Sequence, residues 1–132
     1  MNEQYERIAI VTGATSGIGE ATARLFAASG YGVVGSGRNA EKLADLEREL
    51  GRVFCGVAGD AADEAVIDRL FAASGARFSR EPDIVVANAG RGLGGSVKDA
   101  DLGEFREVLD INVTGALLLL QKAARRMVAM QE

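Results

Sequence analysis

The stretch IAIVTGATSGIG (residues 8–19) decides the fold, because it joins a short apolar run to a glycine-rich turn. The β-branched residues at 8–12 are typical of a buried strand. In the alanine-rich segment at 18–29, apolar residues recur at helical spacing: Ile18, Ala21, Leu25 and Phe26. Gly30 then supplies a helix stop. The sequence therefore predicts a strand, a glycine turn and a helix in direct succession.

The same alternation of strand and helix recurs along the chain. The predicted strands lie at 8–12, 32–36, 53–57 and 84–87. The predicted helices lie at 18–29, between the capping residue Asn39 and Gly51, at 62–78, and from about residue 101 toward the C-terminus. Because apolar strands alternate with long helices, these four βα units predict an α/β fold, a doubly wound parallel sheet of the Rossmann type. The expected strand order is 3-2-1-4, with helices on both faces.

Composition limits the possible classes of function. A chain of 132 residues, 48% of them hydrophobic, suffices for one core, so residues 1–132 are expected to form a single domain. The net charge of −4, with scattered Lys and Arg, argues against nucleic-acid and membrane partners. Without histidine, and with Cys55 as the single cysteine, no metal site is expected. The lone cysteine, expected to be inert, and the polar residues 1–4 favour a cytoplasmic location.

The glycine-rich turn suits a bound phosphate. Gly13 permits a sharp exit from the strand, and Gly17 and Gly19 let the backbone come close both to a bound group and to the sheet. The following helix directs its positive end and its unpaired N–H groups at the crevice beyond the strand ends. Thr15 and Ser16 add hydroxyl donors there. The G-x-x-x-G-x-G spacing without G-K-[ST] argues against a P-loop triphosphatase, and turn formation alone is the remaining alternative.

Four motifs, in order along the chain, resemble the short-chain dehydrogenase/reductase family. They are TGATSGIG at 12–19 with Ile18 inside it, Asp60-Ala61, Asn88-Ala89-Gly90, and Asp110-Ile111-Asn112-Val113-Thr114-Gly115. The resemblance implies the NAD(P)-binding Rossmann domain of an oxidoreductase that moves a hydride between nicotinamide and a carbonyl or alcohol substrate. It also implies that the first three motifs bind the cofactor.

The resemblance implies a role for each polar motif residue, and a structural alternative stays open beside each role. Asp60 is similar to the aspartate that contacts adenine in the family, yet it would equally serve as the N-cap of the third helix. Asn88 resembles the asparagine that steadies the sheet beside the cofactor, or it is a turn residue. Asn112 resembles the asparagine that holds a water in the catalytic proton path, or it is an amide that distorts the helix by bonding to backbone.

Arg38 bears on the choice of cofactor. It follows the second predicted strand, at the place where an acidic residue would bond to the ribose 2′-OH of NAD. Gly37 leaves room there, and the guanidinium fork of Arg38 suits a 2′-phosphate. The sequence therefore predicts NADP(H) rather than NAD(H), with a solvated arginine beside a helix start as the alternative.

The tyrosine and lysine that do the chemistry in the family have no counterpart in these residues. Tyr5 and Tyr31 are followed four residues later by Ala9 and Gly35, so neither stands in a Tyr-x-x-x-Lys pattern. We therefore expect a truncated cofactor-binding half without the C-terminal strands, inactive in isolation, in which Asn112 is a remnant of the proton relay. A stand-alone, non-catalytic dinucleotide-binding or regulatory module is the alternative.

The last helix and the fourth strand predict self-association. Four apolar residues of the helix are expected to face the core: Phe105, Val108, Leu109 and Val113. The segment at 113–120 is apolar nearly all round, although a lone surface helix should be amphipathic. In the family this helix packs against partner subunits, so the resemblance implies a homo-oligomer. The strand at 84–87 is an apolar edge without lysine or internal proline and is a second template for association.

Overall fold

The structure is a computed structural model that describes residues 4–131, so residues 1–3 of the polar N-terminus lie outside the described range. Its elements are β1 (Ile8–Val11), α1 (Gly17–Ala28), β2 (Gly32–Gly37), α2 (Ala40–Leu50), β3 (Phe54–Ala58), α3 (Glu64–Phe78), β4 (Ile84–Val86), α4 (Leu102–Leu109) and α5 (Ala116–Ala129). The strands form one parallel sheet in the order β3-β2-β1-β4. The predicted Rossmann-type sheet and its strand order are confirmed.

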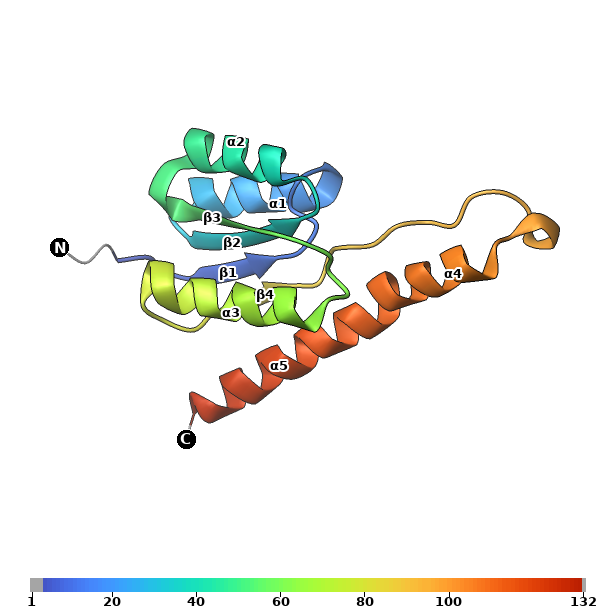
Figure 1. The fold of residues 1–132 in the computed structure, drawn as a ribbon. Coiled ribbons are helices and arrows are strands. Elements are labelled where there is room, and N and C mark those ends of the chain that lie inside the picture. Colours follow the sequence, from blue (N-terminus) through green and yellow to red (C-terminus); the bar gives the residue numbers. More distant parts are fainter. Residues whose placement is uncertain (1–3, 132) are drawn as a thin grey trace.

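Helices cover both faces of the sheet (Figure 1). On one face, α1 and α2 close a core that contains Val11, Ala14, Ala23, Val33, Leu43, Leu46 and Phe54. On the other face, α3 and α5 close a core that contains Ile8, Ile10, Val34, Val57, Val66, Ile67, Leu70, Phe71, Phe78, Leu119 and Ala123. β1 is buried along its whole length, whereas β4 is only half-buried because it lies at the edge. Two separate cores therefore hold the central strands in place.

Helix α1 packs on the sheet through its small residues. Gly19 and Ala23 are buried, while Ile18 and Leu25 are 79% and 67% exposed. Of the apolar residues at helical spacing, Phe26 packs against the core. Small side chains on the inner face let the helix axis lie close to the strands, so the larger residues remain outside. Gly30, with φ +84°, ends the helix as predicted.

The turn between β3 and α3 corrects one alternative for Asp60. The N-cap of α3 is Asp63, whose carboxylate accepts a hydrogen bond from the amide of Ala65 at 2.9 Å. Asp60 instead accepts from the amide of Ala62 at 2.9 Å, one turn earlier. The chain makes this extra turn before the helix starts at Glu64, two residues later than predicted. The interpretation of Asp60 as the helix cap is therefore wrong.

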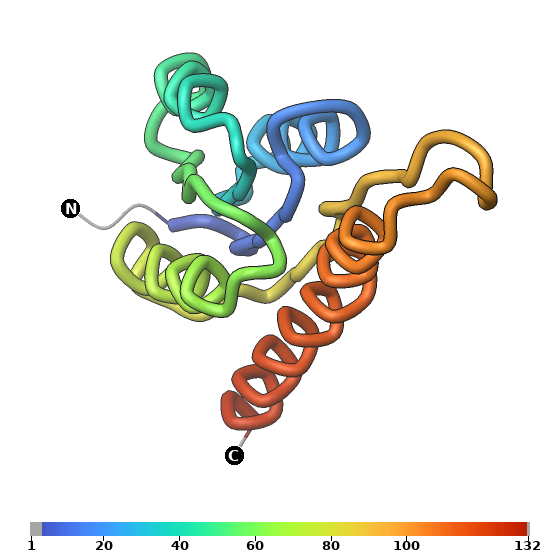
Figure 2. The backbone as a smooth tube through the Cα atoms, turned by 45° about the vertical axis from the view of Figure 1, so that its right-hand side comes forward, coloured from blue at the N-terminus to red at the C-terminus, as the bar shows by residue number. Residues whose placement is uncertain are grey.

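The last helix differs from the expected one in the face that it buries. α4 continues through a π-helical segment (Asp110–Gly115) into α5. Phe105, Leu109 and Val113, expected inward, are 41%, 41% and 57% exposed. The buried positions are instead Ile111, Gly115, Leu119 and Ala123. Figure 1, seen from a second direction in Figure 2, shows the reason: α4 extends beyond the sheet, so no strand of the described residues lies beside it.

The two edges of the sheet differ in how their backbone groups are satisfied. Along the outer edge of β3, charged side chains bond to the backbone: Arg77 Nη1 to the oxygen of Phe54 (3.4 Å), Glu47 Oε2 to the amide of Gly56 (3.3 Å), and Arg69 Nη2 to the oxygen of Ala58 (2.8 Å). Such bonds leave few groups free for another strand. Within residues 4–131, no comparable side-chain bond reaches the outer edge of β4.

No helix within the described residues is long and apolar enough to cross a membrane.

Candidate functional site

A hollow of about 220 Å³ lies beyond the carboxyl ends of β1, β2, β3 and β4. Most of the predicted site residues line it: Gly13, Thr15, Ser16, Arg38, Asp60, Ala61, Ala89 and Gly90. Gly17, Ile18, Gly19, Asn88 and Asn112 do not line it. Five further lining residues were not among the predicted site residues: Ser36, Gly37, Gly59, Arg91 and Ile111. The topology thus brings the segments at the ends of the four strands to one pocket, as expected for such a sheet, and Ile111 of the later helix lies beside them.

The glycines of the first turn have distinct reasons for lacking a side chain. Gly13 and Gly17 adopt φ +67° and +55°, a region that L-residues rarely occupy. Gly19 permits a close approach, because a Cβ there would lie 1.9 Å from the oxygen of Gly13. α1 therefore starts directly against the turn. Ser16, the N-cap of α1, lines the pocket, and the first N–H groups that follow it have no partner inside the helix.

Asn88 does not line the pocket but bonds to the backbone of the glycine turn. Its Nδ2 donates to the backbone oxygens of Thr12 and Gly13, at 3.2 and 3.3 Å. In return, the Thr12 hydroxyl, which is 4% exposed, accepts from the amides of Asn88 and Ala89, each at 3.0 Å. These reciprocal bonds join the end of β4 to the end of β1. Asn88 fixes the shape of the pocket rather than its surface, and Thr12, which sequence reasoning did not single out, shares that role.

Arg38 and Asp60 meet at the mouth of the pocket. Arg38 Nη2 lies 3.0 Å from Asp60 Oδ2, and the two side chains are 59% and 45% exposed. Gly37 brings the turn after β2 against the glycine turn, since a Cβ on it would lie 2.5 Å from Cγ2 of Thr15. Nothing in the sequence spacing predicted that these two site residues form an ion pair, because they lie 22 positions apart.

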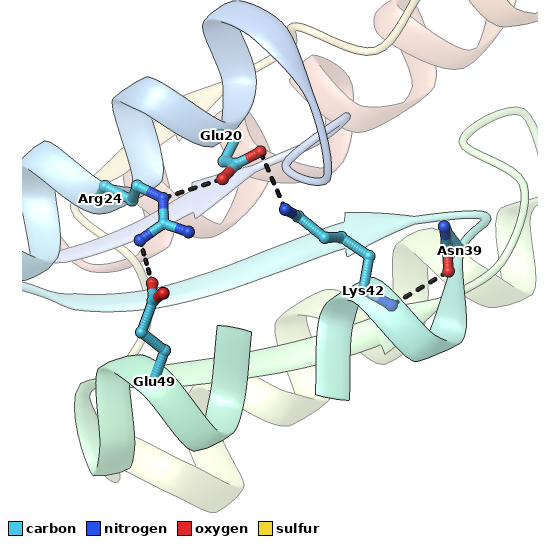
Figure 3. A network of polar contacts seen from close by, with 5 residues as sticks. All are labelled: Glu20, Arg24, Asn39, Lys42 and Glu49. Atoms are coloured by element: carbon cyan, nitrogen blue, oxygen red, sulfur yellow. Dashed lines mark hydrogen bonds and ion pairs between the residues drawn. The ribbon is translucent and has the colours of Figure 1, made fainter. Parts of the chain in front are cut away.

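A network of ion pairs joins α1 to α2 (Figure 3). Glu20 contacts Arg24 at 2.9 Å and Lys42 at 3.5 Å, and Arg24 also pairs with Glu49. The hydrogen bond from Arg24 lowers the pKa of Glu20 below its ordinary value. Asn39 caps α2, as predicted, by accepting from the amide of Lys42 at 3.0 Å. The network fixes the two helix starts that flank the pocket relative to each other.

Asn112 lies on the π-helical segment and holds a loop. Its Oδ1 accepts from the amide of Arg91 and its Nδ2 donates to the oxygen of Arg91, each at 2.9 Å. The amide is thus bonded to backbone, but to the loop after β4 rather than to its own helix. Gly90 makes room for it, because a Cβ there would lie 2.9 Å from Asn112 Oδ1. The Arg91 side chain in turn pairs with Glu107 of α4 at 3.3 Å.

Ser36 stands out among the lining residues that sequence reasoning missed. Its side chain is 1% exposed, and its buried hydroxyl has no hydrogen-bond partner within residues 4–131. A buried hydroxyl without a partner is costly, and a ligand or an ordered water commonly explains one. A serine among glycines at a strand end carries no signal that distinguishes it from a turn residue.

The remaining reactive side chains lie away from the pocket. Tyr31 stacks on Phe26, with ring centroids 5.5 Å apart, and Tyr5 packs edge-on against Phe78 at 5.0 Å. Burial raises the pKa of the Cys55 thiol on β3, which keeps it protonated. Within the described range, no three His, Cys, Asp or Glu side chains are grouped so that they would hold a metal ion.

Known proteins are similar to this chain in both sequence and fold. Serine 3-dehydrogenase of Agrobacterium fabrum is 44% identical over 109 residues, which cover 82% of this chain and 43% of that enzyme. A solved structure of the closed form of serine dehydrogenase complexed with NADP+ matches with a TM-score of 0.85 and 32% identity, over 93% of this chain and 50% of that one. The 3-ketoacyl-(acyl-carrier-protein) reductase from Brucella melitensis, complexed with NADH, matches with a TM-score of 0.83 and 33% identity, over 89% and 49%.

This chain thus spans about half the length of the relatives that it matches. The sequence model that describes short chain dehydrogenases matches residues 7–132, which is nearly all of the chain. Together with the parallel sheet and the glycine turn at its centre, this match leads to one conclusion: the chain belongs to the short-chain dehydrogenase family.

Proposed function

We propose that residues 1–132 form a single NAD(P)-binding Rossmann domain, the NADP(H)-binding part of an oxidoreductase. The observation that carries this proposal is the pocket in which Gly13 of the glycine turn, the α1 N-cap Ser16 and Arg38 meet. In the proposed reaction, the bound nicotinamide supplies or accepts a hydride, and a small-molecule carbonyl or alcohol is its counterpart. The chain's own residues bind and orient the cofactor.

The residues present fit a dinucleotide. The turn lies so close to α1 that a Cβ on Gly19 would collide with it. Thr15 and Ser16 line the pocket, where their hydroxyls add donors to the free N–H groups of the first turn of α1. These donors suit a pyrophosphate. Asp60 and Ala61 would hold the adenosine end, and Ser36, whose buried hydroxyl has no partner among the described residues, lines the same pocket. Asn88 would keep the turn in shape from behind.

The preference for NADP(H) rests on Arg38. A guanidinium at the end of β2 binds a phosphate by charge-assisted hydrogen bonds, and no carboxylate occupies the turn at Gly37, Arg38 and Asn39. One structural relative was solved with NADP+ and another with NADH, so the family alone does not determine the preference. The residue at position 38 supports NADP(H).

Three further parts of the proposal concern the chain as a whole. Without a Tyr-x-x-x-Lys pattern, the isolated 132 residues are expected to bind cofactor but not to transfer a hydride. Asn112 is proposed as a positioning residue that holds the loop at Arg91, and a remnant of the family's relay. The exposed apolar residues of α4 and α5 support a homo-oligomer through this helix, and the lone cysteine supports a cytoplasmic location.

Titration with NADPH and with NADH, followed by the fluorescence of the reduced nicotinamide, tests the proposal. Arg38→Ala should weaken NADPH by ~1.5–3 kcal/mol for each charge-assisted bond that is lost, and should leave NADH nearly unchanged. Arg48→Ala is the matched control, because Arg48 lies on the exposed side of α2 and pairs with Asp45. Equal losses for both cofactors in Arg38→Ala would refute the NADP(H) assignment, and no binding by the folded chain would refute the function.

A further inference from the structure

The ion pair between Arg38 and Asp60 spans the mouth of the pocket from two rigid turns. Arg38 follows Gly37, which is pressed against Thr15, and Asp60 follows Gly59. Gly59 adopts φ +150°, and a Cβ on it would lie 2.4 Å from Val66. Both turns thus pack closely against their neighbours. The two charged groups are therefore presented to each other by the fold itself.

The two partners of this pair are not equally free. Asp60 uses Oδ1 to accept from the amide of Ala62 at 2.9 Å, and its backbone oxygen accepts from the amide of Asp63 at 3.0 Å. Asp60 is therefore held by the backbone of the turn that precedes α3. Arg38 reaches Asp60 through a long side chain that is 59% exposed and has no other hydrogen bond among those recorded for the described residues. Arg38 is therefore the partner with fewer contacts to hold it in place.

Among the described residues that line the pocket, Arg38 is the only positively charged one near the end of β2. The other lining cation within residues 4–131, Arg91, is held by Glu107 of α4. Lys42, in the first turn of α2, is engaged by Glu20 at 3.5 Å. A 2′-phosphate bound beside Arg38 would therefore depend on a guanidinium that already has a fixed carboxylate partner.

Resting on the function proposed above, we infer that Asp60 limits the preference for the phosphorylated cofactor, because its carboxylate competes with the 2′-phosphate for Arg38. The fixed negative charge also repels the phosphate directly. NAD(H) lacks the 2′-phosphate, so it is subject neither to the competition for Arg38 nor to the repulsion by Asp60. Asp60 is thus a specificity-determining residue, and its charge acts against the contribution of Arg38.

An alternative role for Asp60, positioning Arg38 for the phosphate, predicts the opposite effect on NADPH binding. If the carboxylate only positioned Arg38 for the phosphate, its removal would weaken NADPH selectively. Asp60→Asn separates the two roles, because the amide keeps an acceptor oxygen but loses the charge. Any contact of Asp60 with the adenosine that the two cofactors share cancels when the Kd for NADH is divided by the Kd for NADPH.

The experiment measures that Kd ratio, from nicotinamide fluorescence, in the 132-residue chain and its variants. Asp60→Asn should raise the ratio about 1.4- to 5-fold, the range expected for a largely exposed ion pair. Asp63→Asn is the matched control: it removes a carboxylate from the same turn that bonds only to the amide of Ala65 among the recorded side-chain contacts, and it should leave the ratio unchanged. In an Arg38→Ala background, Asp60→Asn should have less effect than in the parent chain.

Circular dichroism establishes that each variant is folded. If Asp60→Asn does not fold, Asp60→Ser, which keeps an acceptor for the Ala62 amide, takes its place. An unchanged or lowered ratio in the folded variant overturns the inference while leaving the proposed function intact. A folded parent chain that binds neither cofactor overturns both, and a parent whose ratio is insensitive to Arg38→Ala overturns the NADP(H) assignment together with the inference.

Discussion

Gly19→Ala is the most direct test of how the glycine turn is built. The added Cβ would lie 1.9 Å from the oxygen of Gly13, 2.7 Å from its carbonyl carbon and 2.5 Å from Nδ2 of Asn88. Two of these atoms are backbone, so no rotamer change relieves the contact. The turn and α1 must separate by about 1.5 Å to restore an ordinary contact distance, which breaks the shared geometry of the site.

The expected loss of stability follows from two opposing effects. Overpacking a rigid contact costs up to about 3 kcal/mol, while alanine in place of glycine inside a helix contributes about 1 kcal/mol. The free energy of unfolding should therefore fall by up to about 2 kcal/mol, and cofactor binding should be lost because the donors of the turn move. The close approach that the structure shows at Gly19 is one of backbone to backbone, and the approach of Gly19 to a bound phosphate stays a prediction.

Urea unfolding followed by circular dichroism measures this change. Gly75→Ala is the matched control, because Gly75 lies in α3 with nothing within 4 Å of the added Cβ. This variant should gain up to about 1 kcal/mol and leave cofactor binding unchanged. If Gly19→Ala were as stable as Gly75→Ala and bound cofactor normally, the account of the turn would be wrong.

Three other expectations can be tested on the same chain. Because Arg24 lowers the pKa of Glu20, the stabilisation from Glu20 is present above the ordinary glutamate pKa and is lost as the pH falls below it. Acid unfolding of Glu20→Gln should therefore show a shallower loss, and an identical pH profile would contradict this. Leu117→Glu should reduce self-association in sedimentation, whereas Leu25→Glu, at the same 67% exposure on α1, should not. A cofactor-oxidation assay with carbonyl substrates should show no turnover by the 132 residues, and measurable turnover would place the chemistry within them.

The sequence predicted the parts of the fold that depend on local pattern. Apolar runs followed by glycine or by a capping residue such as Asn39 determine where strands end and helices begin, and these signals lie within a few residues of each other. The glycine turn was recognisable for the same reason. The meeting of Gly13, Arg38 and Asp60 at one pocket then followed from the parallel topology, which brings the ends of all strands to one side.

What the sequence did not predict depends on which residues lie opposite one another in space. The helical spacing of Phe105, Leu109 and Val113 was real, but α4 extends past the sheet and these residues meet no core. The pairing of Asp60 with Arg38 depends on two turns that are far apart in the chain. The unpartnered hydroxyl of Ser36 depends on its surroundings alone.

The two edges of the sheet are not equally able to pair with a further strand. Arg69, Arg77 and Glu47 occupy backbone groups along β3, so an incoming strand on that side would first have to displace three charged side chains. On the side of β4 it would meet a half-buried, apolar strand without this obstruction. A further strand, from whatever source, is therefore directed to β4. Asymmetric protection of this kind disfavours repeated edge-to-edge pairing of identical copies, because each copy offers only one unobstructed edge among its described residues.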